Sequence, residues 1–174
     1  SIAQFGLDPS QGKVTSGFGV PRHTMLHART KQGHECRFRT AWDTVLWPME
    51  VVHAGIDTDA VLRLTLQCSA ETDFSELEID TLRIHLQGDW MTTMPLYDAL
   101  VSEVQSISVA PEGMNPSLLP RNAWQEVGYS EEHAVLPQPV NAQQAYGLLQ
   151  EYLAFPRKFH FFDLQRLRGR LGSG

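Results

Sequence analysis

VLRLTLQC at residues 61–68 and IDTLRIHLQ at residues 79–87 are the stretches that decide the fold. Apolar and polar residues alternate along both, which is the pattern of half-buried antiparallel strands. The apolar positions are Leu62, Leu64, Leu66 and Cys68 in the first stretch and Leu82, Ile84 and Leu86 in the second. Each buried Leu or Ile contributes roughly 1.5–3 kcal/mol of transfer free energy. We therefore expect these two strands to form the core.

Further strands are predicted on both sides of this pair. Residues 36–40 alternate cleanly, residues 44–56 lean toward strand with an interruption at Pro48, and residues 158–164 form a closing strand. Proline has no N–H to donate to a strand ladder, so the pairing of the second run should break at Pro48.

Two helices are also predicted. Thr92 or Thr93 can cap the first, which admits Pro95 in its first turn. The second begins at Asn141 and ends before Pro156. Its apolar stripe consists of Ala145, Leu148, Leu149 and Tyr152. The sequence therefore predicts a β-rich α+β fold, an antiparallel β-sandwich-like domain with two or three packed helices, formed by residues 1–174 as a single domain.

Composition excludes several classes of protein. The 174 residues carry 20 acids against 14 Lys and Arg, a net charge of −6, which argues against a nucleic-acid groove. The two cysteines, Cys36 and Cys68, make no disulfide framework and favour a reducing compartment. No apolar run approaches the ~18 residues that a membrane span requires, and no signal peptide opens the chain. We expect a cytoplasmic protein. The start at Ser1, close to strand-like residues, further suggests a piece of a longer one.

No motif for catalysis, a metal or a cofactor is visible. The seven histidines form no HExxH pattern and no pair at zinc spacing. There is no Gly-x-Ser-x-Gly turn, and paired acids such as Glu131 and Glu132 fit a solvated surface. A catalytic triad scattered along the sequence stays open at this point.

Four segments carry a resemblance to a known family. They are CRFRT at residues 36–40, VLWPMEV at residues 45–51, LRIHLQGD at residues 82–89 and LLQEYLAFPRKFHFFDL at residues 148–164. In this order they resemble the TssF family (also called ImpG or VasA), a structural subunit of the type VI secretion baseplate. The departures are modest: Leu153, Arg157 and His160 replace the usual Phe, Glu and an apolar residue, and Trp42 stands where a smaller aromatic is common.

The resemblance implies an assembly role without catalysis or a cofactor. It implies an internal piece of a wedge subunit several hundred residues long, bound to the partner subunits TssG and TssK and to a second copy of itself. TssE and the spike and tube proteins are further possible partners. It also implies a cytoplasmic location, docked at the inner-membrane complex, where six wedges surround the spike hub and template the contractile sheath.

Aromatic and arginine residues, which protein interfaces concentrate, are the candidate interface or scaffold residues. They are Arg37, Phe38, Arg39, Trp47, Tyr152, Phe155, Phe159, Phe161 and Phe162. A regular strand over residues 158–164 would place Phe159 and Phe161 opposite Phe162, so it would need cover on both sides. One side can be the domain's own core, and the other requires the helix at residues 141–154 or another chain.

Two other functions remain as alternatives. A β-sandwich module that binds carbohydrate would expose aromatic residues in a cleft, and Trp90, Trp124 and Tyr129 could serve. A hydrolase would bring Ser, His and acidic side chains within hydrogen-bond reach in a pocket.

Overall fold

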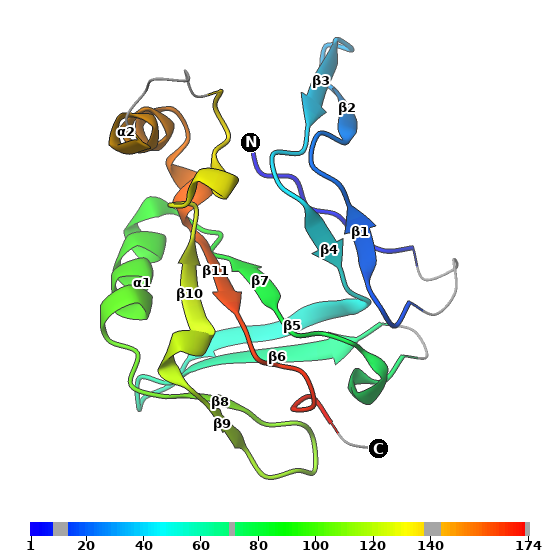
Figure 1. Ribbon diagram of the computed structural model, residues 1–174, viewed down its shortest axis with the longest axis vertical. Coiled ribbons are helices and arrows are strands. Elements are labelled where there is room, and N and C mark those ends of the chain that lie inside the picture. The colour runs from blue at the N-terminus through cyan, green and yellow to red at the C-terminus, as the bar shows by residue number, and fades with distance from the viewer. Residues whose placement is uncertain (9–13, 70–71, 138–143, 173–174) are drawn as a thin grey trace.

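The computed structural model describes residues 1–8, 14–69, 72–137 and 144–172 (Figure 1). The strands are β1 (Phe18–Val20), β2 (Met25–Arg29), β3 (Glu35–Arg39), β4 (Thr44–Leu46), β5 (Met49–Ile56), β6 (Leu62–Cys68), β7 (Leu82–His85), β8 (Ile107–Val109), β9 (Ser117–Leu119), β10 (Trp124–Val127) and β11 (Phe161–Leu164). The α-helices are α1 (Trp90–Ser102) and α2 (Gln144–Ala154), and short 3-10 helices include η4 (Glu131–His133) and η5 (Pro156–Phe159). The predicted start of the second helix at Asn141 lies outside the described residues.

Every strand pairing in the described part of the chain is antiparallel. The strands form one three-stranded sheet, β10-β11-β7, and the two-stranded sheets β1-β4, β2-β3, β5-β6 and β8-β9. This confirms the β-rich α+β class, with the strands distributed over several small sheets. The predicted break at Pro48 is also confirmed, because β4 ends at Leu46 and β5 begins at Met49.

The three-stranded sheet is the centre of the fold, and β11 is its middle strand. Phe162 lies opposite Glu126 of β10 and Ile84 of β7. Helix α1 runs alongside this sheet (Figure 1), and the ring centroids of Tyr97 and Phe162 are 5.3 Å apart. The chain thus covers one face of its central sheet with its own first helix.

The buried core lies around the residues that precede β7, not in β6. Its buried members are Leu77, Ile79, Leu119, Ala123 and Leu167. Ile79 is 1% exposed, whereas Leu64, in the middle of β6, is 37% exposed. The prediction that β6 forms the core is wrong: within the described residues β6 pairs only with β5, and of its apolar residues only Cys68 packs against the buried cluster. β7 does lie in the central sheet, with its four residues half-buried.

Helix α1 begins earlier than the sequence suggested. Asp89, and not Thr92 or Thr93, is the N-cap, since its carboxylate accepts a hydrogen bond from Thr92 N at 3.0 Å. Pro95 consequently lies in the second turn, inside the helix. No helix in the part of the chain that is described has both the length and the apolar character needed to cross a membrane.

The closing strand is shorter than predicted. Residues 156–159 form the 3-10 helix η5, with Pro156 in its first position, and β11 starts only at Phe161. Proline fixes the backbone angle that a helical start needs, which favours a turn here over a longer strand. Phe159 is therefore not part of the strand alternation.

The position of the core makes a testable prediction. Ile79→Ala removes a fully buried side chain and should lower the free energy of unfolding by about 2–5 kcal/mol, whereas Leu64→Ala on the exposed ribbon should lower it by about 1 kcal/mol or less. Chemical denaturation followed by circular dichroism measures both. If Leu64→Ala lowered the free energy of unfolding more than Ile79→Ala does, β6 would have to be counted as part of the core.

Candidate functional site

The predicted interface or scaffold residues separate into two groups. Phe159 and Phe162 are buried, at 5% and 0% exposure, and Trp47, Phe155 and Phe161 are partly buried. The exposed members are Arg37, Phe38, Arg39 and Tyr152. The structure thus places the phenylalanine-rich tail in the interior and leaves β3 and one face of α2 at the surface.

Each face of β11 is covered from within the chain. Trp124 stacks on Phe162 with ring centroids 4.7 Å apart, on the face that α1 covers. On the other face, Phe161 meets Trp42 at 5.2 Å and His85 at 4.4 Å. The helix at residues 141–154 contributes at Phe159, because the ring centroids of Tyr152 and Phe159 are 6.0 Å apart, whereas Phe161 is covered by Trp42 and His85.

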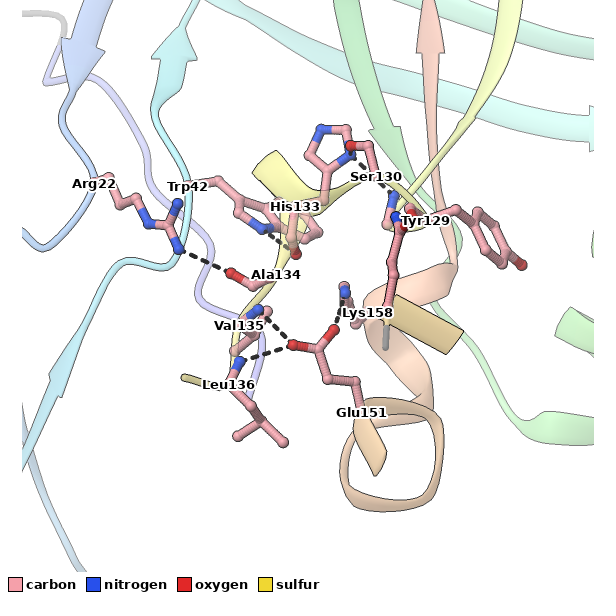
Figure 2. Close-up of polar contacts among 12 residues, drawn as sticks. Arg22, Trp42, Tyr129, Ser130, His133, Ala134, Val135, Leu136, Glu151 and Lys158 are labelled. Atoms are coloured by element: carbon pink, nitrogen blue, oxygen red, sulfur yellow. Dashed lines mark hydrogen bonds and ion pairs between the residues drawn. The ribbon is translucent and has the colours of Figure 1, made fainter. Parts of the chain in front are cut away.

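A buried ion pair holds α2 in place. The carboxylate of Glu151 pairs with the ammonium of Lys158, and both side chains are almost fully buried (Figure 2). The second oxygen of Glu151 accepts hydrogen bonds from Val135 N at 2.7 Å and Leu136 N at 2.8 Å. Although burial raises the pKa of Glu151, hydrogen bonds from Leu136 N and Lys158 outweigh it and keep the pKa below its usual value.

The same segment also receives the N-terminal part of the chain. Trp42 Nε1 donates to the carbonyl of His133 at 2.9 Å, and a guanidinium nitrogen of Arg22 donates to the carbonyl of Ala134 at 2.9 Å (Figure 2). Residues 133–136 are therefore a junction, held from one side by Arg22 and Trp42 and from the other by Glu151.

A second ion pair lies under Trp42. Arg83 of β7 makes two hydrogen bonds to Asp163 of β11, each 2.8 Å long. The guanidinium carbon of Arg83 lies 5.4 Å from the ring centroid of Trp42, within cation–π range. Sequence reasoning missed both ion pairs, because their partners lie on different elements and no spacing rule connects them.

The outward face of α2 is apolar and aromatic, and we call it the α2 stripe. Its members are Tyr146, Leu149, Tyr152 and Leu153. They are largely exposed, up to 75% for Leu153, whereas Gly147 and Glu151 point into the molecule and are buried. The apolar stripe predicted for this helix is thus turned mostly outward, because the buried ion pair occupies the inner side.

The aromatic residues proposed for carbohydrate binding are not brought together. Trp124 is stacked against Phe162, Trp90 lies near His160 at 5.8 Å, and the hydroxyls of Tyr129 and Tyr97 are 2.6 Å apart. A surface cavity of about 370 Å³ has a different lining, made by Pro111, Met114, Asn115, Ser117, Arg168, Gly169, Arg170 and Gly172. Nothing in this geometry favours the carbohydrate alternative.

One Ser–His contact bears on the hydrolase alternative. Ser130 Oγ lies 2.7 Å from His133 Nδ1 (Figure 2), but the other ring nitrogen faces the guanidinium of Arg83 at 3.5 Å. A triad needs a carboxylate at that place to stabilise the protonated ring. Burial, and then the charge of Arg83, lower the pKa of His133. Among the described residues, no group of His, Cys, Asp and Glu could hold a metal ion.

His85 and His160, together with Trp90 of α1, line a small cavity of about 40 Å³. Burial, and then the charge of His160, lower the pKa of His85. Burial, and then the charge of Arg157, lower the pKa of His160. Both pKa values are therefore lower in the folded protein than that of a histidine exposed to water.

Comparison with known proteins gives consistent matches. The family model described as "Type VI secretion system, TssF" matches residues 1–174. Type VI secretion system component TssF1 of Pseudomonas aeruginosa is 30% identical over 190 residues, which cover 98% of this chain and 31% of that protein. The chain thus spans about a third of the length of this relative.

A solved structure has a similar fold. A chain of the type VI secretion system TssK-TssF-TssG baseplate subcomplex, determined by cryo-electron microscopy, matches with a TM-score of 0.73 and 22% identity. The match covers 93% of the present chain and 32% of the solved one.

The buried ion pair predicts a large effect of a small change. Glu151→Gln leaves the buried ammonium of Lys158 without a counter-charge and should cost about 3–5 kcal/mol in the free energy of unfolding. Glu131→Gln, at an exposed position of η4, is the matched control and should change it by about 0.5 kcal/mol or less. Urea denaturation at pH 7 measures both, and equal effects would contradict the prediction.

The buried histidines predict a pH dependence. Because the pKa of His160 is lowered from 6.5 on folding, the unfolded chain binds more protons just below that pH. Stability should be fully present above pH 6.5 and decrease as the pH falls toward the folded pKa. His160→Gln should make the free energy of unfolding depend less on pH between pH 7.5 and pH 5. The control His53→Gln, at an exposed position, should leave that dependence unchanged. Denaturation series at several pH values test this, and an unchanged slope for His160→Gln would contradict it.

Proposed function

The chain belongs to the TssF family of the type VI secretion system, and we propose that it is a structural part of the secretion baseplate that holds other subunits and catalyses no reaction. The observation that carries this proposal is the family match, which runs over all residues from 1 to 174. The aromatic sheet fits the same role, because Trp124 and Tyr97 pack against Phe162 in the interior.

We propose that residues 1–174 form one β-rich domain of a longer wedge subunit. The relatives support this, since the chain corresponds to 31% of the curated relative and 32% of the solved chain. The junction at residues 133–136 supports it too, because hydrogen bonds join Arg22 and Trp42, from the N-terminal part of the chain, to this segment and join the segment to Glu151 of α2.

The proposed partners are TssG and TssK. Both are subunits, with TssF, of the solved baseplate subcomplex, and this chain shares the fold of part of one chain in that subcomplex. A second copy of the chain, TssE and the spike and tube proteins are further partners that a baseplate role predicts. The same role would place the protein in the cytoplasm, docked at the inner-membrane complex when assembled.

The α2 stripe is the surface that we propose for contact with a partner subunit. Aromatic residues and a scarcity of charge distinguish the centre of protein interfaces, and the one charged residue of α2, Glu151, is turned inward. The buried pair with Lys158 also fixes the helix before any partner binds, so little entropy would be lost on docking.

Reconstitution with purified subunits tests the proposal. The protein in its full natural length should co-purify with TssG and TssK. Leu149→Ser combined with Leu153→Ser should weaken that binding at least tenfold, which corresponds to about 1.4 kcal/mol.

Leu118→Ser, at an exposed apolar position of β9 far in sequence from the stripe, is the control and should bind as the wild type does. Failure of the wild-type protein to bind either subunit would refute the baseplate role. Normal binding by the double variant would refute the α2 stripe as the contact surface and leave the baseplate role standing.

A further inference from the structure

The ribbon of β2 and β3 is an arm, and we refer to residues 25–39 as the β2–β3 arm. Among the residues that the structure describes, its two strands pair only with each other, and Figure 1 shows it extending beyond β1 and β4, away from the central sheet. At the tip, Thr30 N donates to His34 O at 2.9 Å, and Gly33, whose φ of 86° suits glycine, donates to Thr30 O. At the base, Thr40 N donates to Thr24 O at 3.0 Å. The arm is therefore hydrogen-bonded from base to tip.

The two faces of the arm differ in chemistry. The register pairs Leu26 with Phe38 and Ala28 with Cys36, and residues paired directly across two strands share a face. One face is thus apolar. The alternate pairs form the other face, which carries the charges: Met25 with Arg39, His27 with Arg37, and Arg29 with Glu35.

Basic residues outnumber acidic ones on this arm. Residues 25–39 contain Arg29, Lys31, Arg37 and Arg39 against the single acid Glu35, a net charge of +3 in a chain of −6, so the remaining residues carry −9. Glu35 is shared between His27, at 2.7 Å, and Arg37, at 3.7 Å. Arg29, Lys31 and Arg39 have no ion pair within the described part of the chain.

The apolar face has little cover. Phe38 is 45% exposed and Ala28 is exposed too, while Leu26 and Cys36 are partly buried. A lone two-stranded ribbon is marginally stable in water, and exposed apolar strands invite unwanted pairing unless charges protect them. The basic residues of the arm give that protection, and a partner that covers Phe38 would supply the missing apolar contacts.

We infer that the β2–β3 arm inserts into a cleft of a partner baseplate protein that has one apolar wall and one wall lined with carboxylates. This inference rests on the proposed assembly role. Guanidinium groups pair well with carboxylates, in two parallel hydrogen bonds. Because Phe38 lies on the opposite face from Arg37 and Arg39, only a partner that contacts both faces uses the whole arm.

The placement of Phe38 and the arginines on opposite faces also favours a protein cleft over other anionic partners. A single nucleic-acid strand binds through bases stacked on aromatic rings and phosphates paired with nearby basic groups, and here Phe38 and the arginines lie on opposite faces. A membrane that accepted Phe38 would likewise leave Arg37 and Arg39 facing water. The arm therefore fits a two-walled protein site best.

The experiment measures binding of the full-length protein to purified TssG and TssK at 50 mM and 300 mM NaCl. Wild-type affinity should fall with salt, and Arg37→Glu with Arg39→Glu should weaken binding at least tenfold at low salt. Phe38→Ser should weaken it at least tenfold at both salt concentrations. Arg121→Glu with Arg168→Glu, at exposed positions outside the arm, is the charge-matched control and should bind normally.

Hydrogen exchange supplies a readout that does not depend on the folding of any variant. Amides of residues 25–39 in the wild-type protein should exchange more slowly in the complex than in the free protein. Unchanged exchange, or normal binding by the charge-reversed and Phe38→Ser variants, overturns the arm as a docking element while leaving the baseplate role intact. Absence of wild-type binding refutes both.

Single-stranded RNA and vesicles containing phosphatidylglycerol serve as competing anionic probes. Weak binding to them that is unaffected by the arm variants agrees with a protein cleft. Tight binding that Arg37→Glu with Arg39→Glu abolishes, together with normal binding of that variant to TssG and TssK, overturns the inference in favour of a nucleic acid or lipid partner.

Discussion

The carboxylate of Glu151 is the point on which the arrangement of the outer elements depends. It is buried, it neutralises the buried ammonium of Lys158, and it accepts two backbone hydrogen bonds from Val135 and Leu136. A charge in the interior is tolerated only when such partners satisfy it, so the position of α2 is specified by chemistry rather than by apolar packing alone. The outward direction of the α2 stripe follows, because the side of the helix that carries Glu151 must face inward.

Sequence patterns predicted where the strands lie more reliably than they predicted which strands are buried. Alternation correctly indicated β6 and β7, but an alternating strand has the same pattern in a central sheet as in a ribbon covered on one side only. Which of the two it becomes depends on long-range pairing: β7 pairs with β11, about 80 residues later in the chain, while β6 pairs with no strand but β5 in the described part of the chain. The core residue Ile79 lies just before β7, and nothing in its local pattern distinguishes it from Leu82 or Ile84.

The candidate surfaces illustrate the same limit. The motif at residues 148–164 led to the family, yet its phenylalanines form the interior, and only Tyr152 of the predicted aromatic set there is exposed. Arg37, Phe38 and Arg39 are exposed as an interface would require, and the β3 register explains why Phe38 is separated from both arginines. The cap at Asp89 was missed because Thr92 and Thr93 have the same capping chemistry, and only the backbone geometry decides among them.

The junction at residues 133–136 has a consequence for how this protein can change over evolutionary time. Arg22 and Trp42 bind carbonyl oxygens there, and Glu151 binds amide nitrogens. All four bonds thus recognise the course of the backbone and not the side chains of that segment. Ala134, Val135 and Leu136 are accordingly free to drift among residues that keep the same path, provided that each retains its amide and carbonyl. The residues that must be kept to hold this segment are therefore the distant ones that bind it: Arg22, Trp42 and Glu151.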